Sequence, residues 1–262
     1  MDLGLQGKSA FVSGSTQGIG YAVARALASE GLRVTLNGRH RDGLESALTR
    51  LRSEVAGASV SGLVADFADA AQVSELLAEL GEVDVLVNNV GLFDMAALED
   101  ITDDDWRRYF DVNVMSGVRL SRHALPRMIA RGWGRIVFIA SEAGVDVPAD
   151  MLHYGTTKAA VLALSNGLAK RTRGTRVTVN SVLGGPTWSD GVARAVEELA
   201  AAQGVETEAL QAAIAGSRNG LLGRFIEPAE IADLVRYLAS PLSSATNGAA
   251  IRAEGGVLAT VL

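Results

Sequence analysis

Two side chains capable of acid–base chemistry, Tyr154 and Lys158, lie four positions apart in a stretch with helical character. On a helix this spacing places them one turn apart on the same face. A phenol has a reference pKa of about 10, and lowering it to neutrality requires roughly 4 kcal/mol of stabilisation of the phenolate. A lysine ammonium one turn away can supply part of that stabilisation, so the pair predicts proton transfer by Tyr154. Such pairs are also common on ordinary helices, so this interpretation depends on the surrounding residues.

A serine, Ser141, follows the apolar run 135–140, which is predicted to be a strand. Ligands of open α/β sheets bind at the carboxyl ends of the strands. The Ser141 hydroxyl is therefore a candidate to hold a carbonyl oxygen close to Tyr154.

A glycine-rich turn lies between the predicted strand 9–12 and a helical pattern that follows it. Glycines at positions 14, 18 and 20 let the backbone turn sharply and approach a pyrophosphate, while free N–H groups at the helix start face the anion. The alternative interpretation is that these glycines only form a turn and bind no ligand. We expect a dinucleotide to contact the loop at Gly14, Ser15, Gln17, Gly18, Ile19 and Gly20.

The end of the second strand favours one dinucleotide over the other. NAD-preferring sites of this architecture usually carry an acidic residue there, whereas this chain reads Asn37-Gly38-Arg39-His40-Arg41. Arg39 offers a planar set of donors to a 2′-phosphate. NADP(H) is therefore favoured as cofactor, and NAD(H) remains possible. The alternative interpretation is that Arg39, His40 and Arg41 are only solvated residues at the start of the next helix.

Strand and helix patterns alternate along most of the chain, which indicates an α/β fold with a parallel sheet covered on both faces. One long helix is predicted to begin after Thr102 and to bend near Pro126. Residues 187–224 interrupt the alternation with helical sequence, and we interpret them as an insertion over one edge within a single domain, 1–262. The predicted strands cover residues 9–12, 33–37, 59–65, 83–87, 135–140, 177–183 and 249–253.

Composition restricts the possible partners and location. The net charge of -6 argues against a nucleic-acid or anionic membrane surface. The chain has no cysteine, and its three histidines are scattered, so a disulfide or a histidine-based metal site is not expected. No signal peptide or membrane-spanning run is recognisable, and we expect a soluble, cytoplasmic protein.

Taken together, these motifs resemble the short-chain dehydrogenase/reductase family over essentially the whole chain. The glycine turn matches the cofactor loop of the family, Asn88-Asn89-Val90-Gly91 resembles its Asn-Asn-Ala-Gly segment, and Ser141 and Tyr154 have its typical separation of 13 positions. The resemblance implies a Rossmann-type doubly wound sheet of about seven strands in the order 3-2-1-4-5-6-7. It also implies a catalytic tetrad formed by Asn113, Ser141, Tyr154 and Lys158.

The implied reaction is reversible hydride transfer between NADP(H) and a carbonyl or secondary alcohol. Tyr154 would protonate the oxygen, Ser141 would position it, Lys158 would also hold the ribose, and Asn113 would hold a water that relays protons. A non-catalytic NADP-binding regulator with this fold is the alternative function, and a hydrolase is disfavoured because no Gly-x-Ser-x-Gly motif is present. The further cofactor contacts implied by the resemblance are Asp66, Phe67, Asn88, Gly91, Gly185 and Thr187.

The chain departs from the family pattern mainly beside the expected nicotinamide. Gly184 stands where the family has proline, and we expect it to loosen that loop. Glu254 replaces the usual aspartate, and the changes at Ser13 and Val90 are mild.

Substrate and assembly are inferred from position in the family. The side chains expected to face the substrate are mostly apolar and favour a partly apolar ketone or alcohol. Packing in the core or in a lid is an equal alternative for them. They are Phe93, Val145, Leu152 and Trp188. Glu142 and His153 are candidate polar contacts, with structural or solvent roles favoured. A homotetramer or homodimer is expected. Docking of an acyl carrier on a basic patch, as in related 3-oxoacyl reductases, is a weaker possibility. The favoured interpretation is that these side chains are solvated cations near helix ends. The residues of the patch would be Arg131, Arg171, Arg173 and Arg176.

Overall fold

A computed structural model of the chain, which describes residues 2–217 and 220–261, has a seven-stranded parallel sheet at its centre. The strand order is β3-β2-β1-β4-β5-β6-β7, so the predicted doubly wound topology is confirmed. The strands are β1 (Ser9–Val12), β2 (Arg33–Gly38), β3 (Val60–Val64), β4 (Val85–Asn88), β5 (Trp133–Ser141), β6 (Arg176–Gly184) and β7 (Ala250–Ala253).

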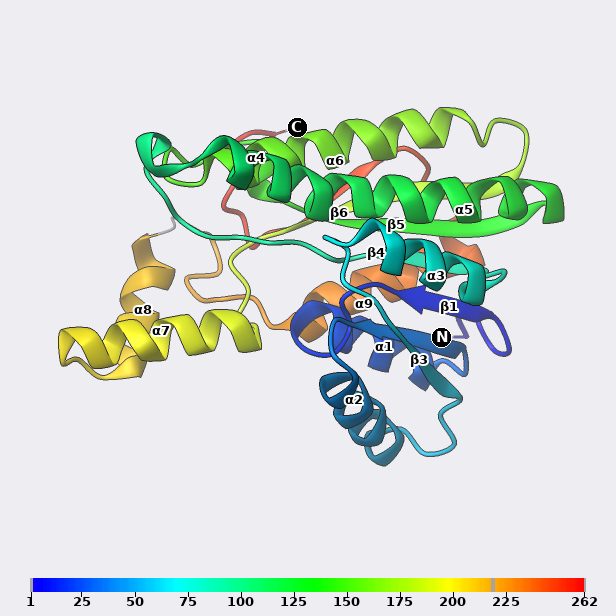
Figure 1. The fold of residues 1–262 in the computed structure, drawn as a ribbon, viewed down its shortest axis with the longest axis horizontal. Coiled ribbons are helices and arrows are strands. Elements are labelled where there is room, and N and C mark those ends of the chain that lie inside the picture. Colours follow the sequence, from blue (N-terminus) through cyan, green and yellow to red (C-terminus); the bar gives the residue numbers. More distant parts are fainter. Residues whose placement is uncertain (1, 218–219, 262) are drawn as a thin grey trace.

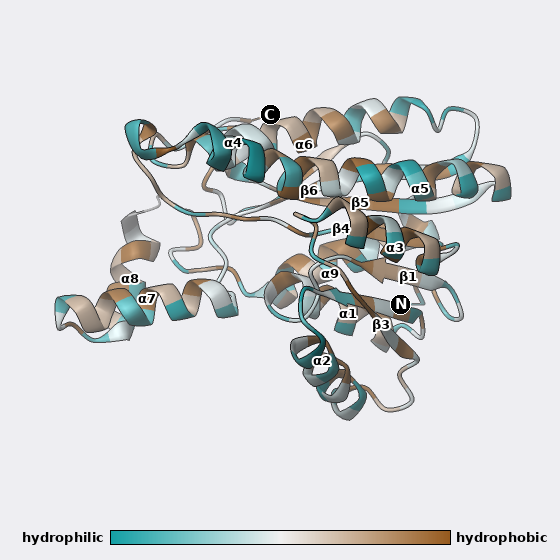
Figure 2. Ribbon diagram, in the orientation of Figure 1, coloured by the Kyte–Doolittle hydropathy of each residue, from teal (hydrophilic) through white to brown (hydrophobic). Residues whose placement is uncertain are grey.

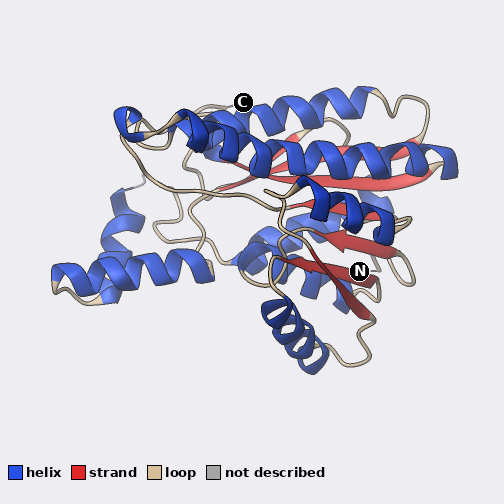
Figure 3. Cartoon of the chain, in the orientation of Figure 1, coloured by secondary structure: helices blue, strands red, loops and turns tan. Residues whose placement is uncertain are grey.

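Helices cover both faces of the sheet (Figure 1, Figure 3). One buried apolar layer contains residues of α1, α2 and α9, and the other contains residues of α3, α5 and α6. Hydrophilic residues concentrate on helices such as α2 and α4 (Figure 2). The helices are α1 (Gly18–Ser29), α2 (Arg41–Glu54), α3 (Ala70–Leu80), α4 (Asp103–Tyr109), α5 (Ser116–Arg131), α6 (Leu152–Lys170), α7 (Asp190–Gln203), α8 (Thr207–Ser217) and α9 (Pro228–Ala239).

The two longest strands, β5 and β6, are almost entirely buried and pair along their whole length. Such continuous apolar runs are typical of strands that are covered on both faces. Their register places Ser141 beside Gly184, and Gly184 also pairs with Ala253 of β7. The prediction that Gly184 loosens a loop is therefore wrong, because the residue lies inside the sheet and the loop begins at Gly185.

The predicted long helix is divided into two segments. Thr102 caps α4 through a reciprocal bond with Asp105, as expected for a capping box. A π-helical turn, Phe110–Met115, then separates α4 from α5, and Pro126 lies within α5. The sequence pattern did not predict this turn, although π-helical turns are frequent at functional sites.

The stretch 187–224 contains α7 and α8 instead of a further strand. These two helices extend beyond one end of the sheet (Figure 1). Residues 218–219 of this stretch lie outside the described residues.

No helix within residues 2–217 and 220–261 is both long and apolar enough to cross a bilayer. The same residues contain no group of three or more His, Cys, Asp or Glu side chains arranged to hold a metal ion.

Candidate active site

The glycine turn lies between β1 and α1, as predicted, and two steric requirements explain its glycines. Gly14 and Gly18 have φ angles of 60° and 57°, in the region that L-residues with side chains rarely adopt. A Cβ on Gly20 would approach the carbonyl oxygen of Gly14 to 2.3 Å. The turn is therefore tight. Because its glycines have no side chains, they do not cover the backbone amide groups of the turn.

Two asparagines hold this turn in place, and sequence reasoning did not assign them that role. The buried Asn37 at the end of β2 accepts a bond from Gly14 N–H at 2.9 Å, and its Nδ2 donates to Leu63 and Ala65 carbonyls. Asn89 Nδ2 donates to the carbonyls of Ser13 and Gly14 at 3.1 and 2.8 Å. A polar amide at the end of a buried strand was the available sequence signal.

The Ser13 hydroxyl, which replaces the usual threonine, keeps an equivalent function. It donates to the Val87 carbonyl and accepts bonds from the backbone N–H groups of Asn89 and Val90. These bonds join the ends of β1 and β4, so the substitution is mild, as expected.

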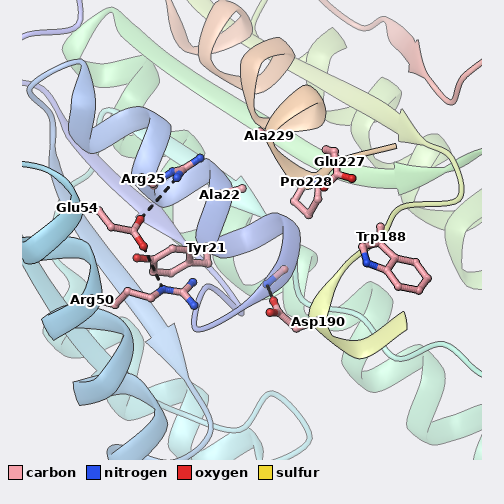
Figure 4. Close-up of a pocket in the computed structure, with 11 residues that line it drawn as sticks. Tyr21, Ala22, Arg25, Arg50, Glu54, Trp188, Asp190, Glu227, Pro228 and Ala229 are labelled. Carbon is pink, nitrogen blue, oxygen red and sulfur yellow. Dashed lines mark hydrogen bonds and ion pairs between the residues drawn. The ribbon is translucent and has the colours of Figure 1, made fainter. Parts of the chain in front are cut away.

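A carboxylate from the insertion contacts the start of α1. Asp190 Oδ2, at the first residue of α7, accepts a hydrogen bond from Gly18 N–H at 2.6 Å. Free N–H groups at a helix start attract anions. The amide predicted to face a pyrophosphate therefore already bonds an anionic oxygen of the same chain (Figure 4).

Arg39 lies directly after β2 and is exposed, in the position expected for a 2′-phosphate contact. Asp66 lies after β3, where its Oδ1 accepts a bond from Ala68 N–H at 2.9 Å. The neighbouring Phe67 is buried in the apolar core, so its side chain packs inside the protein and does not face the loop. A contact of Phe67 with the cofactor would therefore be made by its backbone, and it stays a prediction.

Tyr154 and Lys158 both lie in the first two turns of α6, as the spacing predicted. Lys158 is buried and donates from Nζ to the Ile139 carbonyl at 2.9 Å. Its Nζ lies 5.6 Å from the centroid of the Tyr154 ring. Burial lowers the pKa of Lys158 to about 8, so the ammonium is charged at neutral pH.

Burial has the opposite effect on the phenol, because it disfavours the charged phenolate. The pKa of Tyr154 is raised to about 12 by burial, a hydrogen bond with Ser141 lowers it, and the Glu142 carboxylate raises it further. Ser141 and Tyr154 are thus neighbours, and the predicted proton-transfer group is adjacent to the predicted carbonyl ligand.

Asn113 lies in the π-helical turn and connects it to α6. Its Nδ2 donates to Thr157 Oγ1 at 2.9 Å and to the Leu92 carbonyl at 3.0 Å, while its Oδ1 accepts from Leu92 N–H at 2.6 Å. The amide thereby positions the segment after β4 against the helix that carries Lys158. Water relay through Asn113 stays a prediction.

Gly91 lies directly beside Lys158. A Cβ at Gly91 would lie 3.4 Å from Lys158 Nζ, and the glycine itself is exposed. Asn88 differs, because its Nδ2 contacts Ser121 of α5 at 3.4 Å. The Asn88 side chain therefore points between β4 and α5, and Gly91 is the better-placed residue for a ligand that reaches Lys158.

Of the predicted substrate residues, Phe93 is next to the tetrad. Its ring meets the Tyr154 ring edge-on at 6.5 Å between centroids, and 52% of the residue is exposed. Val145 is also exposed just after the short helical turn 142–144, and Leu152 is half-buried at the first position of α6. An apolar entrance beside Tyr154 agrees with the predicted partly apolar substrate.

Trp188 lies just before α7 and contacts Phe225. Its ring packs on Phe225 at 5.2 Å between centroids, and it lines a pocket between the start of α1 and the start of α9 (Figure 4). None of the tetrad residues lines that pocket. The substrate role of Trp188 stays a prediction.

His153 belongs to a buried structural cluster. Its Nε2 is 2.5 Å from Asp94 Oδ1, and its ring packs against Tyr109 at 4.0 Å and against Trp106 at 6.2 Å between centroids. The structural role is therefore the better description of His153. The cluster joins α4 and α6 to the segment that carries Phe93.

Residues after β6 are fixed to the end of the sheet. Gly185 has no room for a side chain, since a Cβ would lie 2.5 Å from the Glu254 carbonyl oxygen. The Thr187 hydroxyl donates to the Gly185 carbonyl at 2.8 Å. Glu254 is buried, where it accepts from Arg252 at 2.7 Å and from backbone N–H groups of Val257 and Leu258. Glu254 therefore anchors the C-terminal segment.

The candidate basic patch is partly neutralised. Arg131 contacts the Glu82 carboxylate at 2.8 Å and donates to the Val83 carbonyl, and Arg176 donates to the Gly132 carbonyl. Arg171 and Arg173 are exposed. Docking of an acyl carrier at this surface stays an untested prediction.

A doubly wound sheet with a glycine turn after β1, together with Ser141 at the end of β5 and Tyr154 and Lys158 at the start of α6, defines a nucleotide-dependent oxidoreductase domain. The family model for short chain dehydrogenase matches residues 8–200, and the chain belongs to this family. The oxidoreductase YvrD of Bacillus subtilis is 43% identical over 98% of this chain and 99% of its own length.

Two solved structures extend the comparison. L-sorbose reductase from Gluconobacter frateurii, in complex with NADPH and L-sorbose, has a TM-score of 0.94 and 30% identity, and covers 100% of both chains. An actinorhodin polyketide ketoreductase variant with NADPH has a TM-score of 0.88 and 32% identity over 96% of this chain and 97% of its own.

Proposed function

We propose that this oxidoreductase transfers a hydride reversibly between NADP(H) and a carbonyl or secondary alcohol, with Tyr154 as the general acid and base. The observation that carries the proposal is the placement of Tyr154, which is bonded to Ser141 on one side and lies one helical turn from the buried Lys158 on the other. A phenol between a hydroxyl and an ammonium can transfer a proton at the oxygen of a substrate.

The residues around the turn fit a dinucleotide. Gly14, Gly18 and Gly20 allow close approach of a pyrophosphate, and the exposed Gly91 lies next to Lys158 Nζ, the group that would hold a ribose. Arg39 is exposed where a 2′-phosphate would lie. The two NADPH-bound relatives support the same choice of cofactor. When bound, the nicotinamide supplies or accepts the hydride.

In the direction of reduction, Ser141 and Tyr154 hold the carbonyl oxygen and Tyr154 donates its proton to it. The single Ser141 proton stays with the substrate oxygen, and the Lys158 ammonium lies 5.6 Å from the centroid of the ring that becomes the phenolate. Burial raises the pKa of Tyr154 to about 12, and we assign to the Lys158 charge the role of lowering it during proton transfer. Asn113 holds the segment 91–92 beside Lys158.

A panel of ketones, aldehydes and secondary alcohols, followed by NADP(H) absorbance, tests the proposal. We expect turnover with wild type and a loss of about 10²-fold or more in Tyr154→Phe, because the variant lacks the transferred proton. Leu164→Met, on the same helix and away from the tetrad, is the matched control and should keep the wild-type rate. Equal turnover in wild type and Tyr154→Phe would contradict the proposed role.

We also infer that the protein assembles as a dimer or tetramer through α5 and α6. The two helices lie side by side on one face of the sheet (Figure 1), and α6 exposes small residues such as Ala163. Small side chains permit close helix packing between subunits. Light scattering of the purified protein tests this inference, and a monomer at micromolar concentration would contradict it.

A further inference from the structure

The Ser141 hydroxyl is already engaged before any substrate binds. Its Oγ lies 2.5 Å from Glu142 Oε2, to which it donates its single proton, and it accepts a bond from Ala143 N–H at 3.2 Å. The Glu142 backbone is itself fixed, because its carbonyl accepts bonds from Val145 and Asp146 N–H groups. To donate to a carbonyl oxygen, Ser141 must therefore turn its proton away from the Glu142 carboxylate.

This carboxylate opposes the reaction of a simple ketone in two ways. It holds the proton that Ser141 would give to the substrate, and its charge raises the pKa of Tyr154. When Ser141 turns to the substrate, Glu142 Oε2 also gives up a charge-assisted hydrogen bond in a half-buried position. A substrate that donates its own proton to Glu142 removes this disadvantage.

We propose that Glu142 is the receptor for a hydroxyl group on the carbon next to the reacting carbonyl, so that the preferred substrates are α-hydroxy ketones and, in the reverse direction, 1,2-diols. This inference rests on the proposed oxidoreductase function and names its substrate class.

The geometry of the two oxygens agrees with this assignment. Oxygens on adjacent carbons lie about as far apart as two hydrogen-bonded oxygens, which is the spacing between Ser141 Oγ and Glu142 Oε2. One substrate oxygen can therefore accept from Ser141 and Tyr154 while its neighbour donates to Glu142.

The charge of Glu142 also excludes some substrates. A carboxylate next to the reacting carbonyl, as in a 2-oxo acid, would face Glu142 with like charge at short range. The rest of the substrate meets the exposed side chains of Phe93 and Val145, which accept an apolar or uncharged chain. A neutral hydroxyl at the reacting end and an uncharged remainder fit this site together.

The test compares hydroxyacetone with acetone, and 1-hydroxy-2-octanone with 2-octanone, as substrates for NADPH oxidation by the full chain. We expect wild type to prefer each hydroxy ketone by about tenfold or more in kcat/KM, because a hydrogen bond to a charged group is involved. In Glu142→Ala this preference should disappear, and in Glu142→Gln it should decrease while some is retained. Asp146→Asn, which removes a nearby exposed carboxylate, is the matched control and should keep the preference.

A second readout distinguishes a direct contact from a general structural role. Because the Glu142 charge raises the pKa of Tyr154, the pH profile for alcohol oxidation should move to lower pH in Glu142→Gln. An unchanged profile in Glu142→Gln, with its fold intact, would overturn the proposed closeness of the carboxylate to the reacting groups.

Failure of the inference and failure of the proposed function give different results. Wild type that consumes NADPH equally well with the hydroxy and simple ketones overturns the inference and leaves the oxidoreductase function standing. A preference for aminoacetone over hydroxyacetone overturns the hydroxyl assignment in favour of a cation. No NADPH consumption with any carbonyl overturns the proposed function, and the inference with it.

Discussion

Replacing Lys158 by methionine is expected to stabilise the fold while it abolishes turnover. Lys158 is 5% exposed, and its burial disfavours the charged ammonium. Methionine has a similar length and no charge, so it removes the cost of burying the cation. Function and stability therefore make opposite demands at this position.

The size of the effect follows from the pKa. Burial lowers the pKa of Lys158 from 10.5 to about 8. At neutral pH the lysine is protonated in both the folded and the unfolded chain, so this shift lowers the free energy of unfolding of wild type by about 3 kcal/mol. Methionine also leaves the Ile139 carbonyl without the Nζ donor, at a cost of about 1 kcal/mol. The variant should thus gain about 2 kcal/mol in the free energy of unfolding near neutrality.

The gain should depend on pH in a definite direction. Between about pH 8 and pH 10.5 the unfolded chain binds a proton on Lys158 that the folded chain has released, so wild type is stabilised as the pH rises through this window. The advantage of the variant should therefore shrink from neutral pH toward about pH 10.

Urea unfolding of the cofactor-free protein, followed by circular dichroism at one protein concentration, measures both quantities. Lys170→Met, at the exposed end of the same helix, is the control, and it should change stability by less than about 0.5 kcal/mol. A Lys158→Met variant that is less stable than wild type near neutrality, or whose advantage is the same at both pH values, would refute the reasoning.

Three further predictions concern the dinucleotide turn. Arg39→Ala should weaken NADPH binding by about tenfold and leave NADH binding unchanged, since the charge-assisted contact is with the 2′-phosphate alone; equal losses for both cofactors in a fluorescence titration would contradict this. Asp190→Ala should lower the NADPH dissociation constant about two- to fivefold, because the carboxylate now bonded to Gly18 N–H competes with the anion, and weaker binding in the same titration would argue against that competition. Gly20→Ala should destabilise the fold by about 2 kcal/mol or more, because the new Cβ meets the Gly14 carbonyl oxygen at 2.3 Å, and a melting temperature equal to wild type would show that the turn can relax.

Much of the fold was predictable because its signals are local. Apolar runs bounded by turn residues indicated the strands, and the glycine spacing indicated the turn after β1. The four-residue separation of Tyr154 and Lys158 indicated a shared face of α6. In each case the pattern lies within one short segment, and the physical constraint acts along the chain.

The features that sequence reasoning missed depend on contacts between distant segments. Asn37, near the end of β2, holds the turn that follows β1. The pairing of His153 with Asp94 also joins positions far apart in the chain. Trp188 likewise packs against Phe225, which is far from it in the sequence. Such partners cannot be read from spacing, since nothing in the neighbouring residues specifies which distant group will be met.

Glu142 shows how one adjacent residue changes the interpretation of a predicted site. The motif indicated that Ser141 holds a carbonyl oxygen, but the structure gives its proton to Glu142. The apolar residues near Tyr154 suggested a partly apolar substrate, and the carboxylate adds a requirement for a donor at the reacting end. The same hydroxyl caps the short turn 142–144 by accepting a bond from Ala143 N–H.

The central claim is hydride transfer from NADPH to a carbonyl carbon with Tyr154 as the proton donor. NADPH carrying deuterium at the transferred position of the nicotinamide, incubated with hydroxyacetone, tests it directly when the product is analysed by mass spectrometry. Wild type should place one deuterium on the new carbinol carbon, and Tyr154→Phe should form product far more slowly. Tight NADPH binding by wild type with no labelled alcohol from any carbonyl tested would contradict the account and favour a non-catalytic NADP-binding protein.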